Sequence, residues 1–184
     1  AGLNEDECLI IKPLNLLTYK PTIYAPNVSE DDLANGNDWV EKVRNIAAAE
    51  NAQLVVISAQ VESELIELPE EEIADYLESL GVEEGGLKSL IKATYQLLGL
   101  RTYFTTGEKE TKAWTIKAGM LAPQAAGVIH TDFERGFIRA ETIAYEDLVT
   151  SGSMTAAKEK GLLRSEGKDY LVKEGDIMLF RFNV

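Results

Sequence analysis

Two short polar stretches of the sequence carry side chains suited to holding a ligand, and each follows an apolar segment. They are Asn27-Val28-Ser29-Glu30 and Ser58-Ala59-Gln60. Side-chain amides, carboxylates and backbone N–H groups are the donors and acceptors that can read the edge of a purine base. Each stretch is also typical of a polar turn that ends a strand and starts a helix. A base-reading loop and a simple turn are therefore the two interpretations of each stretch.

The pair of stretches favours base reading more than either one alone. In guanine-specific P-loop proteins, an Asn-Lys-x-Asp loop and a Ser-Ala-Lys loop hold these positions at consecutive strand ends. Here Val28 replaces the first Lys, Glu30 replaces the Asp and Gln60 replaces the second Lys. An Asp accepts from both N1–H and N2–H₂ of guanine, and a Glu, with its extra methylene, does not keep that geometry. Adenine, which has a donor where guanine has O6, then becomes acceptable.

The elements that must position these loops read as a strand, a helix and a second strand. Residues 22–25 and 53–59 are apolar runs bounded by breakers, and each predicts a buried strand. Between them, residues 37–51 place apolar side chains at helical spacing, with Asn37 or Asp38 as the cap. This order predicts a parallel pair of strands, whose carboxyl ends meet at one edge of the sheet where ligands bind.

The remainder of the first half is helical and acidic. Residues 61–68 and 69–81 predict two acidic helices, and Glu70–Glu72 reads as a solvated helix start rather than a metal site. Residues 86–99 predict a third helix that ends at Gly99, with one apolar side formed by Leu87, Leu90, Ile91, Tyr95 and Leu98.

The second half has the pattern of a small mixed sheet wrapped around one or two helices, a grasp-like α+β unit. The expected elements are a hairpin over residues 101–107 and 109–117, a helix over 123–130, a strand over 136–145, a helix over 153–161, and a terminal hairpin over 169–182 that turns at Glu174-Gly175.

Charge divides the chain near Gly99. The net charge is −13, with 19 acids against 6 bases in residues 1–98 and 12 against 12 in residues 99–184. We therefore expect two domains, 1–98 and 99–184, of which the second is free to carry a local basic face. The N-terminal residues lack the basic flank and apolar stretch of a signal peptide, and no apolar run is long enough to cross a bilayer, so we expect a cytoplasmic protein.

Several classes of catalytic site are poorly supported. The chain has one histidine and one cysteine, Cys8, and contains no HExxH, CxxC or GxSxG motif. It also lacks the GxxxxGK[ST] loop that holds the β and γ phosphates of a nucleotide. We therefore expect no catalytic residue in this chain and no hydrolysis of nucleoside triphosphate by the chain alone.

A second candidate surface lies in residues 125–148. His130, Arg135 and Arg139 occur in a mixture of polar and aromatic residues that suits RNA, with phosphate contacts from arginine. The alternative is that His130 caps a turn and that the neighbouring Phe133 and Phe137 belong to the core.

Longer strings resemble the YchF (Obg-like ATPase) family of P-loop proteins. "APQAAGVIHTDFERGFIRAETIAYEDL", "LRTYFTTGEKETKAWTIKAG" and "GKDYLVKEGDIMLFRFNV" resemble the family's C-terminal TGS domain, and "KPTIYAPNVSE" resembles its altered base-specificity loop. The resemblance implies an α/β fold: residues 1–98 as the C-terminal part of a P-loop, Ras-like parallel α/β domain with acidic helices, and residues 99–184 as a ubiquitin-like β-grasp TGS domain. It also implies that the phosphate and magnesium ligands lie outside this chain.

The resemblance also implies a function. It places purine contacts at Asn27, Val28, Ser58, Ala59 and Gln60, with Glu30 relaxing guanine specificity so that ATP is preferred. The expected cofactor is ATP or GTP with Mg²⁺, and the expected partner is the ribosome or RNA. An intact protein of this kind would hydrolyse the nucleotide. The alternative is a non-enzymatic adaptor that docks on RNA or the ribosome, and a P-loop upstream in the same reading frame would discriminate between the two.

Overall fold

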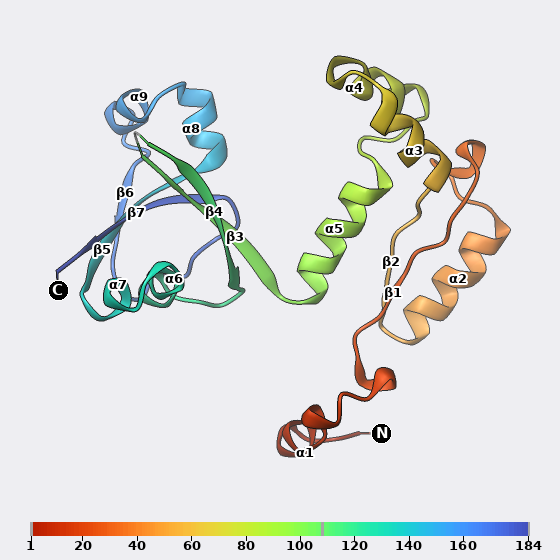
Figure 1. Cartoon of the computed structure of the whole chain (residues 1–184), viewed down its shortest axis with the longest axis horizontal. Helices are drawn as coiled ribbons and strands as arrows, with labels where there is room; N and C mark the ends of the chain where they lie inside the picture. The colour runs from red at the N-terminus through yellow and green to blue at the C-terminus, as the bar shows by residue number, and fades with distance from the viewer. Residues whose placement is uncertain (1, 108, 184) are drawn as a thin grey trace. The chain divides into compact units, whose positions relative to one another are not determined.

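The computed structural model describes residues 2–107 and 109–183. The chain is an α/β protein that divides into two compact units, Ala1–Leu97 and Leu98–Val184 (Figure 1). Among the described residues, no helix is long and apolar enough to cross a membrane.

The first unit contains the strand–helix–strand arrangement that the sequence predicts. β1 (Ile23–Tyr24) pairs in parallel with β2 (Gln53–Leu54), and α2 (Asp38–Ala49) connects them. The Asn37 side chain caps α2 by accepting from the backbone N–H groups of Trp39 and Val40. The parallel pair is thus confirmed, although both strands are shorter than expected. The preceding segment contains α1 (Glu5–Ile11) and the short helices η1 (Lys12–Leu14) and η2 (Leu17–Tyr19).

Three further helices complete the first unit: α3 (Ala59–Glu67), α4 (Glu70–Ser79) and α5 (Gly86–Leu97). Two side-chain contacts join them. The Tyr76 hydroxyl on α4 donates to the Glu64 carboxylate on α3, and the Gly86 N–H at the start of α5 donates to the Glu62 carboxylate at 2.6 Å. These bonds hold α4 and α5 against the helix that follows the second polar loop.

Much of the expected apolar surface of the first unit is exposed. Trp39 on α2 is 72% exposed, and Leu87 and Ile91 on α5 are 58% and 52% exposed, whereas Val40 and Ala47 are buried. The helices are amphipathic as predicted, but a two-stranded sheet presents too little surface to cover their apolar sides.

The second unit is built on a five-stranded sheet in the order β4-β3-β7-β5-β6. The central neighbours β3 and β7 are parallel, while β3–β4, β5–β7 and β5–β6 are antiparallel, so the sheet is mixed and the predicted β3–β4 hairpin is confirmed. The elements are β3 (Leu100–Thr106), β4 (Thr111–Lys117), α6 (Ala122–Ile129), α7 (Thr131–Arg135), β5 (Phe137–Ala144), α8 (Tyr145–Ser151), α9 (Met154–Glu159), β6 (Arg164–Glu166) and β7 (Asp176–Phe182).

Helices cover both faces of this sheet (Figure 1). On the face toward α6, Tyr103, Met178 and Phe180 pack with the small residues Ala122 and Ala125. The Tyr103 hydroxyl donates to the Ala125 carbonyl at 2.9 Å, and burial raises the pKa of this phenol. The opposite face is covered at one end, where β5, β7, α8 and α9 contribute a second cluster that contains Ile143, Ala157, Ile177 and Leu148.

The predicted terminal hairpin over residues 169–182 is wrong. Residues 170–172 run beside the start of α6 instead, with the Ala122 N–H donating to the Tyr170 carbonyl at 2.8 Å and the Val172 N–H donating to the Met120 carbonyl at 3.2 Å. β7 pairs with β5 and β3. The turn at Gly175 exists, but it is tied to β3 by a bond from its N–H to the Thr102 carbonyl at 2.9 Å.

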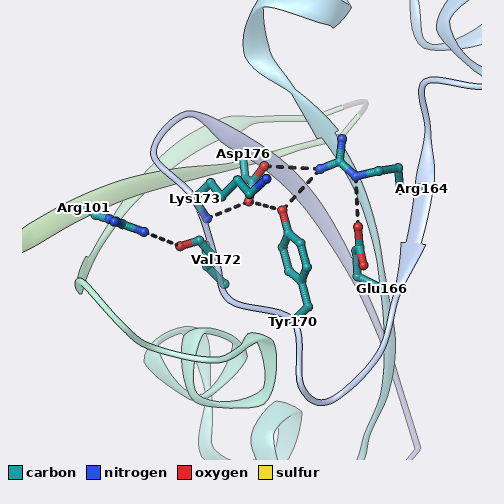
Figure 2. A network of polar contacts seen from close by, with 7 residues as sticks. All are labelled: Arg101, Arg164, Glu166, Tyr170, Val172, Lys173 and Asp176. Atoms are coloured by element: carbon teal, nitrogen blue, oxygen red, sulfur yellow. Dashed lines mark hydrogen bonds and ion pairs between the residues drawn. The ribbon is translucent and has the colours of Figure 1, made fainter.

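A buried carboxylate explains this course of the chain. Asp176 is only 2% exposed and accepts from the Tyr170 hydroxyl and from the Lys173 N–H, each at 2.8 Å (Figure 2). The Arg164 guanidinium lies 3.7 Å from the same carboxylate and also donates to Glu166 at 2.9 Å. Burial, together with the bond to Asp176, raises the pKa of Tyr170 to about 12. These contacts hold Tyr170 and Lys173 close to Asp176, the first residue of β7. Residues 169–173 therefore do not pair with β7 as the second strand of a hairpin.

Candidate functional site

The two polar loops lie side by side at the carboxyl ends of β1 and β2. Beyond the paired strands, Asn27 forms a parallel bridge with Ile57. The Val28 N–H donates to the Ile57 carbonyl at 2.9 Å, and the Ile57 N–H donates to the Pro26 carbonyl at 3.0 Å. The structure therefore brings together the two loops that the sequence analysis paired.

A side-chain bond joins the loops directly. The Asn27 Oδ1 atom accepts from the Ala59 N–H at 2.8 Å. A backbone N–H can only donate, so the atom of the Asn27 amide that it contacts must be the oxygen. The two hydrogens on Nδ2 can then be donated to other groups. Asn27 is exposed, so these two hydrogens can reach a ligand.

The second loop is largely occupied in building the start of α3. Ser58 is 1% exposed and caps the helix, its Oγ accepting from the Val61 N–H at 3.5 Å. The Gln60 amide donates to Glu64 one turn along the helix at 3.1 Å. Ser58 is thus a buried residue that supports the loop, while Ala59 and Gln60 are exposed.

Glu30 begins the short helix η3 (Glu30–Asp32) directly after the first loop. Asp32 anchors this turn by accepting from the Ser29 hydroxyl at 3.1 Å and from the Asn37 amide at 2.8 Å. Among the residues that the structure describes, no side chain donates to the Glu30 carboxylate. Glu30 is exposed, so its charge is available to a ligand.

Tyr76 is a neighbour of this site that no sequence motif identifies. The bond to Glu64 raises the pKa of Tyr76 to about 12, with smaller contributions from burial and from the negative charge of Glu30. Its phenol stays protonated at neutral pH. The contact between α4 and α3 depends on helix packing, which no short motif encodes.

The described residues hold no group of three His, Cys, Asp or Glu side chains arranged to bind a metal ion. Glu70, Glu71 and Glu72 form the first turn of α4. The two loops of this unit can thus contact a base, but residues 2–97 contain no cluster of side chains suited to binding a phosphate group or a metal ion.

The second candidate surface is less concentrated. His130 caps α7, its Nδ1 accepting from the Asp132 N–H at 3.2 Å, and Arg135 lies at the end of that helix. No hydrogen bond or ion pair in the described part of the chain joins either residue to Arg139. Phe137 is 4% exposed, which confirms the expectation that it belongs to the core. Phe133 is partly buried, packs against that core and stacks on Phe182 with ring centroids 3.9 Å apart.

Arg139 has partners that the sequence analysis missed. It donates to Glu141 at 3.2 Å and lies opposite Arg181, which donates to the same carboxylate at 3.2 Å. The spacing of Arg139 and Glu141 suits one face of a strand, but Arg181 joins them only because β7 lies beside β5.

Comparisons with known proteins agree with these features. Residues 100–183 match the family model YchF-GTPase_C, whose description reads "Protein of unknown function (DUF933)". The chain is 57% identical over 182 residues to the "Ribosome-binding ATPase YchF" of Bacillus subtilis, covering 98% of this chain and 50% of that protein. It is 52% identical over 182 residues to the protein of the same name from Escherichia coli O157:H7, covering 99% of this chain and 50% of that one. The chain spans about half the length of the curated relatives it matches.

Solved structures give the same picture. The Schizosaccharomyces pombe YchF GTPase superposes with a TM-score of 0.79 at 36% identity, over 98% of this chain and 48% of that one. A GTP-binding protein from Pyrococcus horikoshii OT3 superposes with a TM-score of 0.61 at 17% identity, over 99% of this chain and 58% of that one, which shows likeness of fold alone.

Proposed function

Since the chain belongs to the YchF family, we propose that its first unit supplies the base-binding loops of a purine-nucleotide site and that its second unit attaches the protein to the ribosome. In this account, residues 1–98 are the C-terminal part of a P-loop domain of Ras-like type. Residues 99–184 form a β-grasp TGS domain, for which the mixed sheet with parallel β3 and β7 at its centre gives support.

The main support for a purine site in the first unit is the hydrogen bond from the Ala59 N–H to Asn27 Oδ1 at 2.8 Å. It leaves the Asn27 Nδ2 to donate to N7, which is an acceptor in both adenine and guanine. The same bond occupies the Ala59 N–H, so that this donor is not offered to O6 of guanine. Both consequences favour a site that accepts purines in general.

Glu30 adds to the acceptance of adenine. An Asp at its position would accept two hydrogen bonds from guanine, and the longer Glu side chain does not reproduce that pattern. Val28 replaces a lysine of the guanine readers and adds no donor of its own. We therefore propose that ATP binds at least as well as GTP.

The nucleotide's phosphates and Mg²⁺ would be held by residues outside this chain. A bound triphosphate supplies the bond that is hydrolysed, and the residues described here orient the base at its other end. Because the sequence contains no GxxxxGK[ST] loop, the 184-residue chain alone should have no magnesium-dependent triphosphatase activity. Release of phosphate by the purified chain, after removal of contaminating enzymes has been verified, would contradict this assignment.

The names of the relatives support the second part, because the Bacillus subtilis and Escherichia coli proteins are called ribosome-binding ATPases. The charge-balanced second half suits contact with a polyanion better than the acidic first half does. His130, Arg135 and Arg139 remain candidates for this contact, and association with the ribosome would place the protein in the cytoplasm. Co-sedimentation of the chain with purified ribosomes at several salt concentrations tests it, and absence of the chain from the pellet at low salt would contradict it.

A further inference from the structure

Two arginines face each other across neighbouring strands of the second unit. Arg139 on β5 is the direct register partner of Arg181 on β7. Both side chains are 51% exposed. Like charges directly opposite each other in an antiparallel pair are destabilising, so this placement calls for a counter-charge.

Glu141 supplies only part of that counter-charge. Its Oε1 accepts from Arg139 Nη2 at 3.2 Å, and its Oε2 accepts from Arg181 Nη2 at 3.2 Å. The bond from Arg181, together with the nearby charges of Arg139 and Lys158, lowers the pKa of the Glu141 carboxyl. Two arginines thus share one carboxylate, which leaves a surplus of one positive charge at this contact in a chain whose net charge is −13.

The surface around this cluster is exposed to solvent and includes one apolar side chain, Leu179, which is 44% exposed. In the row beside the arginines, Glu141 lies between Ser165 of β6 and Leu179 of β7, and Ser165 accepts weakly from Arg139 at 3.4 Å. The next row on this face, Ile143 and Ile177, is buried in the cluster that includes Ala157 of α9. The open part of the sheet face is therefore occupied mainly by charged groups, with Lys158 of α9 close to it.

We propose that Arg139 and Arg181 form a binding site for the phosphate backbone of RNA, and that Glu141 holds the two guanidinium groups in place until a phosphate takes over its contacts. The two oxygens of the Glu141 carboxylate accept hydrogen bonds from both guanidinium groups. A phosphate also presents paired anionic oxygens, which can accept two parallel hydrogen bonds from a guanidinium group. Hydroxyl and cationic side chains are suited to contact with the sugar-phosphate backbone, which carries no sequence information. This inference rests on the proposed ribosome association of the second unit and names the surface that would carry it.

The test uses the 184-residue chain and a fluorescently labelled uridine oligonucleotide, with binding followed by anisotropy over a salt series. Arg139→Gln and Arg181→Gln should each weaken binding by about three- to tenfold and reduce the slope of log K against log salt by about 0.7. Glu141→Gln should tighten binding by about threefold, since the competing carboxylate is removed. Arg139→Lys and Arg181→Lys keep the positive charge but lose the planar guanidinium group that donates two parallel hydrogen bonds. Their affinities for the oligonucleotide should lie between those of the wild type and the Gln variants.

A matched control comes from the first unit. Arg44 forms an exposed pair with Glu41 at 3.1 Å, with an exposure of 53% close to that of the two arginines. Arg44→Gln removes the same charge from a pair outside the proposed site and should leave RNA binding unchanged. Thermal melting of each variant identifies any that fail to fold. If a Gln variant fails to fold, the affinity of the corresponding Lys variant is used to test the site.

The outcomes separate this inference from the proposed function. Wild-type chain that co-sediments with ribosomes, but whose RNA affinity is unchanged by every substitution at these three positions, overturns the arginine site and leaves ribosome association standing. Variants that lose ribosome binding while keeping oligonucleotide binding would assign the arginines to an acidic protein surface and overturn the RNA contact. Wild-type chain that does not co-sediment at all contradicts the proposed function itself.

Discussion

The Ala59 N–H donates to Asn27 Oδ1 at 2.8 Å across two loops that are 32 residues apart in the sequence. This one bond fixes the orientation of the Asn27 amide, ties the ends of two parallel strands together and leaves an amide donor pointing out of the pair. The proposed contact between Asn27 and the purine base depends on this bond.

Substitutions at Asn27 separate the structural part of this bond from the base contact. Asn27→Asp keeps an oxygen for the Ala59 N–H but has no hydrogen to donate to N7, so the stability of the first unit should be retained while nucleotide affinity falls by about tenfold. Asn27→Ala should lose both, with the free energy of unfolding reduced by about 1 kcal/mol. Nucleotide titration and thermal melting of the two variants check this. An Asp variant that binds nucleotide as the wild type does would remove the amide from base recognition.

Gly86 is expected to be intolerant of a side chain. A Cβ atom at this position would lie 2.9 Å from Ile57 Cγ2 and 3.1 Å from Ile57 Cα, directly before the second loop. Gly86→Ala should therefore lower the free energy of unfolding by about 1–3 kcal/mol and weaken nucleotide binding by displacing Ser58. Gly167→Ala, where no atom lies within 4 Å, is the control and should melt as the wild type does. Equal melting temperatures for the two variants would show that α5 moves freely away from Ile57.

Thr142 offers a stabilising substitution. Its side chain is fully buried in β5, and its Oγ1 atom has no hydrogen-bond partner among the described residues. Thr142→Val keeps the shape and removes the unsatisfied hydroxyl, which should raise the free energy of unfolding by about 1 kcal/mol. Thr115→Val, on an exposed position of β4, should change it little. Urea denaturation measures both, and destabilisation by Thr142→Val would indicate that the hydroxyl has a partner in solution.

The Tyr76–Glu64 bond makes a pH-dependent contribution to stability. It requires a protonated phenol and an ionised carboxylate, and the bond lowers the pKa of Glu64 below its ordinary value of 4.5 while raising that of Tyr76 from 10.0 to about 12. The contribution is therefore present between about pH 5 and pH 10. It disappears as the pH falls through the lowered pKa of Glu64 or rises through that of Tyr76.

Ultraviolet titration of tyrosinate tests this assignment. The difference between wild type and Tyr76→Phe should show a phenol that ionises near pH 12, and the stability advantage of the wild type should vanish at both ends of the pH range. A difference signal that rises near pH 10 would mean that Tyr76 does not donate to Glu64 in solution.

The adjacency of the two loops was predictable, because a parallel strand pair with one connecting helix brings successive carboxyl ends to the same edge. The bond between Asn27 and Ala59 was not, since it depends on a bridge beyond the paired strands. Residues 170–172 are a short apolar run of the kind found in strands, yet the buried Asp176 carboxylate binds Tyr170 and prevents a hairpin. Likewise Arg181 meets Arg139 only through the order of strands in the sheet, which pairs residues 42 positions apart and leaves no local pattern.

The most direct test of the account is a titration of ATP against GTP in a full-length protein that carries this chain, before and after Glu30→Asp. The account predicts that the wild type binds ATP at least as tightly as GTP. It also predicts that the Asp variant shifts the ratio toward GTP by about tenfold, the value of one regained hydrogen bond to a charged group. A clear preference of the wild type for GTP, with no shift in the Asp variant, would contradict it.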